Sequence, residues 1–340
     1  MNASRTGEWP DPEWALGDAA PSSALEAVDE LFGSDAPGVT LAAVVVRAGR
    51  ITVERYGRQP DTVFGPGSAV DYSTPLISWS MAKSIVHCAT SILIDEGRLE
   101  LGRSSLLDQW TDERSMITLD DLLRMRDGLD FVEEYVEGEG APTPDVIEML
   151  FGAGSADVAG YASSRPPRHP PGTTWNYSSG TTNIVARVLG DLLGGREGVE
   201  RFLRDRLFGS IGMTTARPVF DDAGTFIGSS YVHASARDFA RFGYLYLNDG
   251  SWNGRRIVSA ARVREAAESH AVDPDTGHGY GRHWWLWRNR PSVLAALGYE
   301  GQRIIVDSER DLVVVHLGKW TVEHQASLDG LLDRILIAHD

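Results

Sequence analysis

The sequence predicts an α+β fold, in which an antiparallel sheet built from both ends of the chain is flanked by helices, with a mainly helical region inserted. Runs with high strand propensity lie near the N-terminus and again near the C-terminus, whereas between about residues 100 and 250 apolar residues recur at helical spacing. Strands that follow one another through short turns pair antiparallel, which argues against a wound parallel sheet.

The individual elements follow from local patterns in chain order. Residues 1–25 are rich in Pro, Asp, Ser and Ala, which is typical of an extended arm, and Trp9 and Trp14 are expected to tie it down. Two β-rich runs joined by Ala48-Gly49-Arg50 predict a hairpin. The predicted helices are 26–33, 80–96 (closed by Gly97), 120–126, 181–193, 234–247 and 323–339, and the predicted strands are 40–47, 51–56, 283–287, 294–297, 303–307 and 312–317.

The length and the order of these elements predict the domain organisation. A chain of 340 residues can form one large domain or two that pack closely together. We expect an N-terminal arm at 1–25, an α/β sheet domain formed by 26–100 and 270–340, and a mainly helical domain at 101–269.

Charge and composition exclude several classes of partner. The formal net charge is −16 and the chain has no long basic run, so neither nucleic acid nor an anionic membrane surface is expected as a partner. No stretch is long and apolar enough to span a bilayer, and the N-terminus lacks the pattern of a secretory signal. The single cysteine, Cys88, lies in an apolar run and cannot form an internal disulfide. These features predict a cytoplasmic protein, with the oligomeric state left open and a homodimer as one alternative.

Lysine is rare in this chain, which makes the position of one lysine informative. Of the 32 Lys and Arg residues, only Lys83 and Lys319 are lysines. Arginine stays protonated in proteins and cannot serve as a base, so a retained lysine points to a need for proton transfer. Lys83 follows Ser80 by three residues, in Ser80-Met81-Ala82-Lys83. A coding bias against lysine explains the scarcity but not this position.

The Ser80 and Lys83 pair has the chemistry of an activated nucleophile. If Ser80 opens a helix, the two side chains lie one turn apart on the same face. A serine hydroxyl needs a base to take its proton, and lysine can be that base if burial lowers its pKa. The backbone N–H of Ser80, at a helix N-terminus, could also stabilise an oxyanion. The alternative is an N-cap serine with a surface lysine, but Trp79 and the apolar helix that follows favour a nucleophile at the mouth of a cleft.

Several segments resemble one enzyme superfamily. Ser80–Lys83 resembles the first motif of the serine β-lactamase and penicillin-binding-protein superfamily. Residues 171–180 (PGTTWNYSSG) are similar to the PG…YSN segment of class C β-lactamases and family VIII esterases, and 120–129 (DDLLRMRDGL) resembles their LL…TSGL segment. Further landmarks lie at 234–243 (ASARDFARFG) and 280–285 (YGRHWW), in the expected order. The resemblance implies a β-lactamase/transpeptidase-like fold.

Within this superfamily, the chain is most similar to the 6-aminohexanoate-dimer (nylon oligomer) hydrolase-like group. The similarity is carried by Ser-Met-Ala-Lys-Ser at 80–84, Gly-Leu-Asp-Phe at 128–131 and Gly301-Gln302. The resemblance implies that the phenol of Tyr177 lies near Ser80 and Lys83, shares protons with them and protonates the leaving group. A nearby lysine ammonium would favour the tyrosinate. The alternative is that Tyr177 is an ordinary core tyrosine.

Two motifs depart from the pattern of the superfamily. The second motif usually ends in asparagine, and here Ser179 takes that place. A serine hydroxyl can still donate a hydrogen bond to substrate, but it lacks the separate donor and acceptor groups of an amide. The third motif, usually Lys-Thr-Gly, is replaced by Tyr299-Glu300-Gly301. Glu300 would repel the carboxylate of a β-lactam or of a peptidoglycan stem, while Gly301 still permits close approach. The resemblance implies that the N–H of Gln302 completes the oxyanion hole with that of Ser80.

These observations predict a serine hydrolase that forms an acyl-enzyme and cleaves a carboxylic ester or a linear amide, a small-molecule substrate, without a cofactor. The alternatives are a β-lactamase or DD-peptidase activity and a non-catalytic binding relative of the fold.

No serine lies in Gly-x-Ser-x-Gly, so a nucleophile-elbow hydrolase is not supported. The spacing of His278 and His283 does not match a metal motif, so no metal site is expected. Lys319 is interpreted as a loop lysine, and the acidic run 133–139 as a solvated loop, with selection of a cationic substrate end as the alternative.

Overall fold

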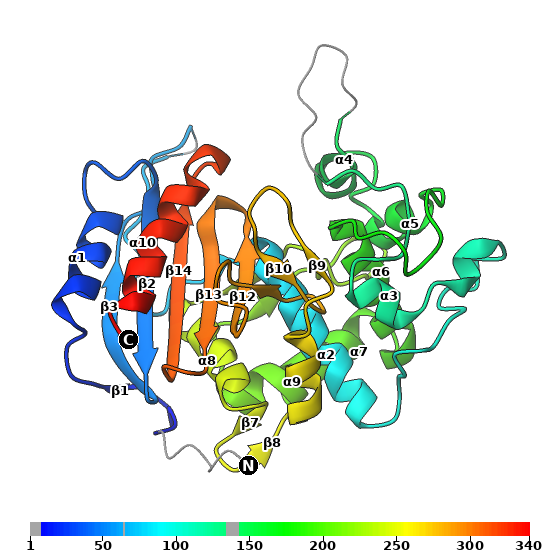
Figure 1. Ribbon diagram of the computed structural model, residues 1–340. Coiled ribbons are helices and arrows are strands. Elements are labelled where there is room, and N and C mark those ends of the chain that lie inside the picture. Colours follow the sequence, from blue (N-terminus) through cyan, green and yellow to red (C-terminus); the bar gives the residue numbers. More distant parts are fainter. Residues whose placement is uncertain (1–7, 64, 134–142) are drawn as a thin grey trace.

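One large sheet joins the two ends of the chain. The computed structural model describes residues 8–63, 65–133 and 143–340. Among these residues, nine strands form a sheet in the order β1-β3-β2-β14-β13-β12-β11-β10-β9 (Figure 1). The strands are β1 (Ala15–Leu16), β2 (Val39–Arg47), β3 (Arg50–Tyr56), β9 (Ala271–Val272), β10 (Gly279–Tyr280), β11 (Trp285–Leu286), β12 (Val293–Gly298), β13 (Gln302–Asp307) and β14 (Leu312–Lys319). The predicted sheet built from both chain ends is confirmed, because β2 pairs antiparallel with β14.

The sheet differs from the expectation at its two edges. β1 pairs parallel with β3, so the N-terminal segment supplies an edge strand rather than only an arm. At the other edge, the predicted strand 283–287 is reduced to β11, and the two-residue strands β9 and β10 were not expected. Strands this short have no alternation that a sequence pattern could detect. Trp9 and Trp14 do tie the N-terminal segment down, with ring centroids 5.3 and 5.4 Å from that of Tyr244.

The central strands are apolar on both faces. In β14, Val313 and Val315 face one core, whereas Leu312 and Val314 face the other. Strands that are buried on both faces are apolar at nearly every position, which explains the sequence Thr-Leu-Ala-Ala-Val-Val-Val in β2. The β2–β3 hairpin closes through Ala48 and Gly49, both with positive φ (49° and 79°), as a tight two-residue turn requires.

Different helices cover the two faces (Figure 1). On one face, α1 (Ser22–Leu31) and α10 (Gln325–Ile337) pack against each other and share a core with the sheet. On the other face lies α8 (Ala236–Leu247), whose N-cap is Ser235. A Cβ at Gly243 would lie 2.7 Å from Val313 and 2.8 Å from Ile304, so glycine permits this helix to approach the sheet closely.

The remaining elements form the helical side of the molecule. The almost completely buried helix α2 (Ala82–Asp95) lies between the sheet and this region (Figure 1). No helix in the described ranges is both long and apolar enough to cross a membrane. The other helices are α3 (Leu119–Leu123), α4 (Asp145–Phe151), α5 (Val158–Ser163), α6 (Ser179–Leu193), α7 (Arg196–Phe202) and α9 (Ala260–Ala266), with short helical turns η1 (Trp79–Met81), η2 (Glu113–Met116), η3 (Leu203–Phe208), η4 (Gly209–Ile211), η5 (Tyr299–Gly301) and η6 (Val322–His324).

In the described part of the chain, two small sheets lie outside the main one, although little strand structure was expected in the middle of the chain. The first has the order β4-β6-β5 and the second pairs β7 with β8. The first sheet matters for function because it holds the segment that precedes Ser80. Their strands are β4 (Leu76–Ile77), β5 (Arg217–Pro218), β6 (Val232–Ala234), β7 (Ser251–Trp252) and β8 (Arg255–Arg256).

A buried histidine connects the central strands to the turn between β12 and β13. His316 Nδ1–H donates to the carbonyl of Gly301 (2.7 Å), so its Nε2 accepts from the Thr40 hydroxyl at 3.0 Å. Trp320 Nε1 donates to the same hydroxyl (3.2 Å). Burial lowers the pKa of His316 from 6.5 to about 4, because the imidazolium would lose its hydration.

This network predicts acid sensitivity. Below pH 6.5 the unfolded chain protonates His316, whereas the folded protein does so only near pH 4, so the free energy of unfolding should fall by up to about 1.4 kcal/mol per pH unit in this window. His316→Gln should remove this contribution and flatten the pH dependence measured by urea denaturation. Above neutral pH the two proteins should show the same dependence. An unchanged slope below pH 6.5 would contradict the assignment.

Candidate active site

The backbone before α2 presents Ser80 in a fixed conformation. Ser80 lies in η1, a 3-10 turn that begins one residue before the predicted helix start, and Trp79 has a φ of 43°. Ser78, two residues earlier, is fully buried and is held by strand β6. Its N–H donates to the carbonyl of Val232 (2.8 Å), and its hydroxyl accepts from the N–H of Val232 (3.1 Å). The position of Ser80 is therefore set by a chain segment more than 140 residues later.

Lys83 is buried and has three hydrogen-bond partners among the residues that the structure describes. Its side chain is only 1% exposed, and Nζ lies 3.0 Å from Ser80 Oγ, 2.9 Å from Ser179 Oγ and 3.0 Å from the carbonyl of Ser229. Burial lowers the pKa of Lys83 to about 8, although the charge of Glu133 opposes this shift. A surface lysine, the alternative for this pair, is excluded. About a tenth of Lys83 is then a neutral amine at pH 7, far more than for an unperturbed lysine.

Tyr177 lies against the same pair. Its hydroxyl is close enough to Ser80 to affect the pKa of the phenol, and Lys83 Nζ lies 4.9 Å from the centroid of its ring. The ring packs against Trp285 at 5.0 Å. Burial and the charge of Glu133 raise the pKa of Tyr177, and these effects outweigh those of Ser80 and Trp285, which lower it. The phenol is therefore protonated at neutral pH, which is the reverse of the expectation that the lysine would favour a tyrosinate.

Ser179 connects Lys83 to a carboxylate that the sequence pattern did not identify. Ser179 is the first residue of α6, after the N-cap Ser178. Its N–H donates to Glu133 Oε2 (2.7 Å) and its hydroxyl to Glu133 Oε1 (2.6 Å). The hydroxyl that was expected to donate to substrate thus donates to Glu133. Glu133 was grouped with the acidic run, whose residues 134–139 lie outside the described residues; its place just after the 128–131 motif was the available signal.

The end of β12 approaches the turn that carries the nucleophile. A Cβ at Gly298 would lie 2.5 Å from the carbonyl oxygen of Ser78 and 3.2 Å from the N of Ser80, so a glycine backbone contacts this turn directly. Gly301 instead faces Trp320, whose side chain would lie 3.3 Å from a Cβ placed on this glycine. Gln302 is 2% exposed, and its Nε2 donates to the carbonyl of Gly318 (2.8 Å). The Gln302 side chain is therefore directed at β14 rather than at Ser80, and the role expected for its backbone N–H stays a prediction.

Aromatic rings and one ion pair lie around Trp79, the residue before Ser80. Tyr299 is 54% exposed, and its ring meets that of Trp79 edge-on at 5.6 Å. The Trp79 ring also contacts that of Tyr231, at 5.8 Å. Glu300 accepts from Trp79 Nε1 (3.0 Å) and pairs with Lys319 Nζ (3.5 Å). Lys319 ends strand β14, so its interpretation as a loop lysine is wrong, and the charge of Glu300 is partly compensated.

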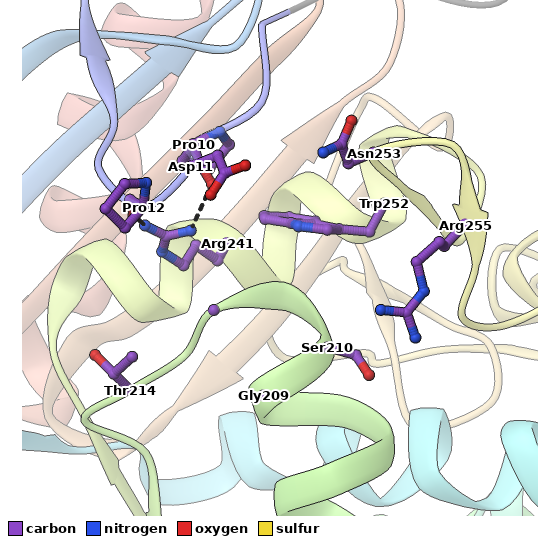
Figure 2. Close-up of a pocket in the computed structure, with 11 residues that line it drawn as sticks. Pro10, Asp11, Pro12, Gly209, Ser210, Thr214, Arg241, Trp252, Asn253 and Arg255 are labelled. Atoms are coloured by element: carbon purple, nitrogen blue, oxygen red, sulfur yellow. Dashed lines mark hydrogen bonds between the residues drawn. The ribbon is translucent and has the colours of Figure 1, made fainter.

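A separate depression of about 340 Å³ lies away from Ser80, between the N-terminal segment and β7. Figure 2 shows the guanidinium of Arg241 directed at Pro10 and Pro12, to whose carbonyls it donates hydrogen bonds. A third donor bond goes to the carbonyl of Ile211, at 3.4 Å. Arg241 therefore anchors the N-terminal segment.

In the described ranges, no group of three or more His, Cys, Asp or Glu side chains is placed to hold a metal ion.

Comparisons with known proteins agree on one family. A model of the Beta-lactamase family matches residues 27–336. The chain is 26% identical over 281 residues to the 6-aminohexanoate-dimer hydrolase of Paenarthrobacter ureafaciens, covering 76% of this chain and 69% of that protein. A Bacillus anthracis structure assigned as a 6-aminohexanoate-dimer hydrolase superimposes with a TM-score of 0.74 at 21% identity, over 98% of this chain and 88% of that one. A family VIII carboxylesterase superimposes with a TM-score of 0.70 at 16% identity, over 95% and 99% of the two chains.

The contact at Gly298 predicts a stability cost for a single methyl group. Gly298→Ala should lower the free energy of unfolding by about 2 kcal/mol, because the new methyl would overlap the Ser78 carbonyl oxygen, a backbone atom that cannot move independently. Gly330→Ala in α10 is the matched control, since no atom lies within 4 Å of its Cβ position and alanine favours a helix. Chemical denaturation of both variants tests the contact, and equal stability would contradict it.

Proposed function

The chain belongs to the Beta-lactamase family, and we propose that it is a serine hydrolase that forms an acyl-enzyme on Ser80 and cleaves a carboxylic ester or a linear amide. The observation that carries this proposal is the distance of 3.0 Å between Ser80 Oγ and the amine of Lys83, which is buried and has its pKa lowered to about 8. A base with a pKa near the working pH transfers protons efficiently.

Acylation begins with proton transfer from Ser80. Neutral Lys83 takes the hydroxyl proton while Oγ forms a bond to the substrate carbonyl carbon. Tyr177, which is held protonated, gives its proton to the leaving alkoxide or amine as the bond to that group breaks. The Lys83 ammonium then returns a proton to the phenolate of Tyr177. These transfers leave Lys83 neutral, Tyr177 protonated and Ser80 acylated, so water can release the acid by the same groups in reverse order.

The negative charge that develops on the carbonyl oxygen requires donors fixed in place. The N–H of Ser80 is one such donor. Gly298 lies against the turn that carries Ser80 and pairs with Gln302 across the hairpin, so we expect the second donor to be a backbone N–H within residues 298–302. The resemblance assigns this role to the N–H of Gln302.

The substrate class is supported by the residues near Ser80 and by some of the relatives. Aromatic rings of Trp79, Tyr231 and Tyr299 offer apolar contact area. One relative is named a 6-aminohexanoate-dimer hydrolase and one similar structure a family VIII carboxylesterase, which favours linear amides and esters. Lys319 supports β-lactam hydrolysis as a second candidate, because its ammonium lies beside the position of the third motif and could attract a carboxylate.

The role of Lys83 predicts that arginine cannot replace it. Lys83→Arg should lower ester turnover by about 1,000-fold or more and abolish labelling of Ser80 by a fluorophosphonate, because a guanidinium stays protonated. Ser80→Ala should lose the adduct entirely. Lys319→Arg makes the same exchange at the other lysine and keeps its charge beside Glu300, so it should still form the adduct. Wild-type turnover by Lys83→Arg would refute the proposal and favour a different catalytic centre.

The substrate class is tested by comparing rates on one enzyme preparation. A panel of short-chain esters, linear amides, aminohexanoate oligomers and nitrocefin should give the highest kcat/KM on an ester or linear amide, at least about tenfold above nitrocefin. Ser80→Ala supplies the background rate for each compound. A higher value on nitrocefin would instead support the β-lactamase alternative, and no turnover or adduct with any compound would support a non-catalytic relative.

A further inference from the structure

We propose that Glu133 is a positioning residue, which acts through Ser179 to direct the lone pair of Lys83 at Ser80. The proposal rests on the proposed function in assigning Lys83 as the base. It assigns a role to a residue that lies outside the Ser80, Lys83 and Tyr177 group and does not contact Ser80.

The first step is the contact between Glu133 and Ser179. Each oxygen of the carboxylate accepts one bond, Oε2 from the backbone N–H of Ser179 and Oε1 from its hydroxyl. An ionised carboxylate can only accept hydrogen bonds, so the single hydroxyl hydrogen of Ser179 must point at Glu133. The backbone bond fixes the carboxylate in this orientation. Ser179 Oγ can therefore offer only lone pairs to any other neighbour.

The second step is a count of hydrogens at Lys83. Its three neighbours are Ser80 Oγ, Ser179 Oγ and the carbonyl of Ser229, all within 3.0 Å. Two of them, Ser179 and Ser229, are acceptors only. A neutral amine has two hydrogens and one lone pair, so both hydrogens are used by these two acceptors. The lone pair is left facing Ser80, where it can receive the hydroxyl proton.

This arrangement also accommodates the protonated state. When Lys83 becomes an ammonium, its third hydrogen lies on the line to Ser80, and the bonds to Ser179 and Ser229 stay as they were. Proton transfer therefore requires no rotation of the amine. If Ser179 were free to turn its hydrogen toward Lys83, it would compete with Ser80 for the lone pair.

The charge of Glu133 has a separate, measurable effect. The titratable groups that face Lys83 are Glu133, Tyr177 and His283. Burial keeps Tyr177 protonated and lowers the pKa of His283 to about 3, so both are neutral at neutral pH. Glu133 is then the ionised neighbour that holds up the pKa of Lys83 against burial. Removing its charge should lower that pKa further.

The first test measures the pKa of Lys83 directly and needs no substrate. Because the chain has two lysines, protein labelled with ¹³C-lysine gives two side-chain signals, and Lys319→Arg identifies the one from Lys83. Glu133→Gln should lower the Lys83 pKa relative to wild type. Asp130→Asn removes a charge three residues away, where the carboxylate pairs with Arg168 on the surface, and should leave it unchanged. An equal Lys83 pKa in wild type and Glu133→Gln would overturn the proposal.

The second test measures the hydrogen-bond role at a pH on the plateau of the rate profile, where Lys83 is already neutral. Glu133→Gln should lower kcat by about 100-fold with little change in KM. The Gln amide can donate to Ser179 Oγ, so the hydroxyl hydrogen of Ser179 is free to turn toward Lys83 and to compete with Ser80 for the lone pair. The acid limb of the profile should also move to lower pH. In a Ser179→Ala background, Glu133→Gln should have little effect on kcat, since the hydroxyl through which Glu133 acts on Lys83 is absent.

The outcomes separate this proposal from a structural role and from the proposed function. A residue that only capped α6 would alter the melting temperature but neither the acid limb nor the coupling to Ser179. A wild-type kcat in Glu133→Gln, or additive effects of the two changes, would contradict the positioning role. If wild-type protein showed neither turnover nor a Ser80 adduct, the proposed function would fail, and the titration of Lys83 would still decide the role of Glu133.

Discussion

The burial of the Lys83 amine is the constraint on which the rest of the site depends. An amine removed from water must find acceptors within the protein, or its burial costs several kcal/mol. Here they come from Ser80 one turn earlier, from Ser179 at the start of α6 and from the carbonyl of Ser229 before β6. Glu133 in turn holds Ser179. The local pKa values and hydrogen positions follow from meeting this requirement.

The fold supplies these groups by joining distant parts of the chain. The pairing of β2 with β14 closes the sheet across both ends, and it leaves β12 beside the turn that carries Ser80. The small β4-β6-β5 sheet fixes the residues before Ser80 and those around Ser229 from the helical side. The site thus lies where the main sheet meets the helical region, and neither side contains all of its atoms.

The sequence indicated the parts of this arrangement that depend on local spacing. Long apolar runs predicted the central strands, the Ser-x-x-Lys spacing placed Ser80 and Lys83 together, and the family resemblance implied that Tyr177 lies beside them. The contacts that it missed lie far apart in the chain or in elements too short to have a period. Glu133 and Ser179 are 46 residues apart, and β4, β5 and β1 have two residues each. The orientation of Gln302 depended on which side of a hairpin turn faces the helix, which a motif does not specify.

The distribution of the two lysines has a practical consequence for handling the protein. Lys83 is 1% exposed, whereas the side chain of Lys319 is 38% exposed and pairs with Glu300, which contacts Trp79 next to Ser80. Among side chains, amine-directed crosslinking or immobilisation would therefore attach the protein to a support close to its own site. The many surface carboxylates of this acidic chain are the better handles for coupling.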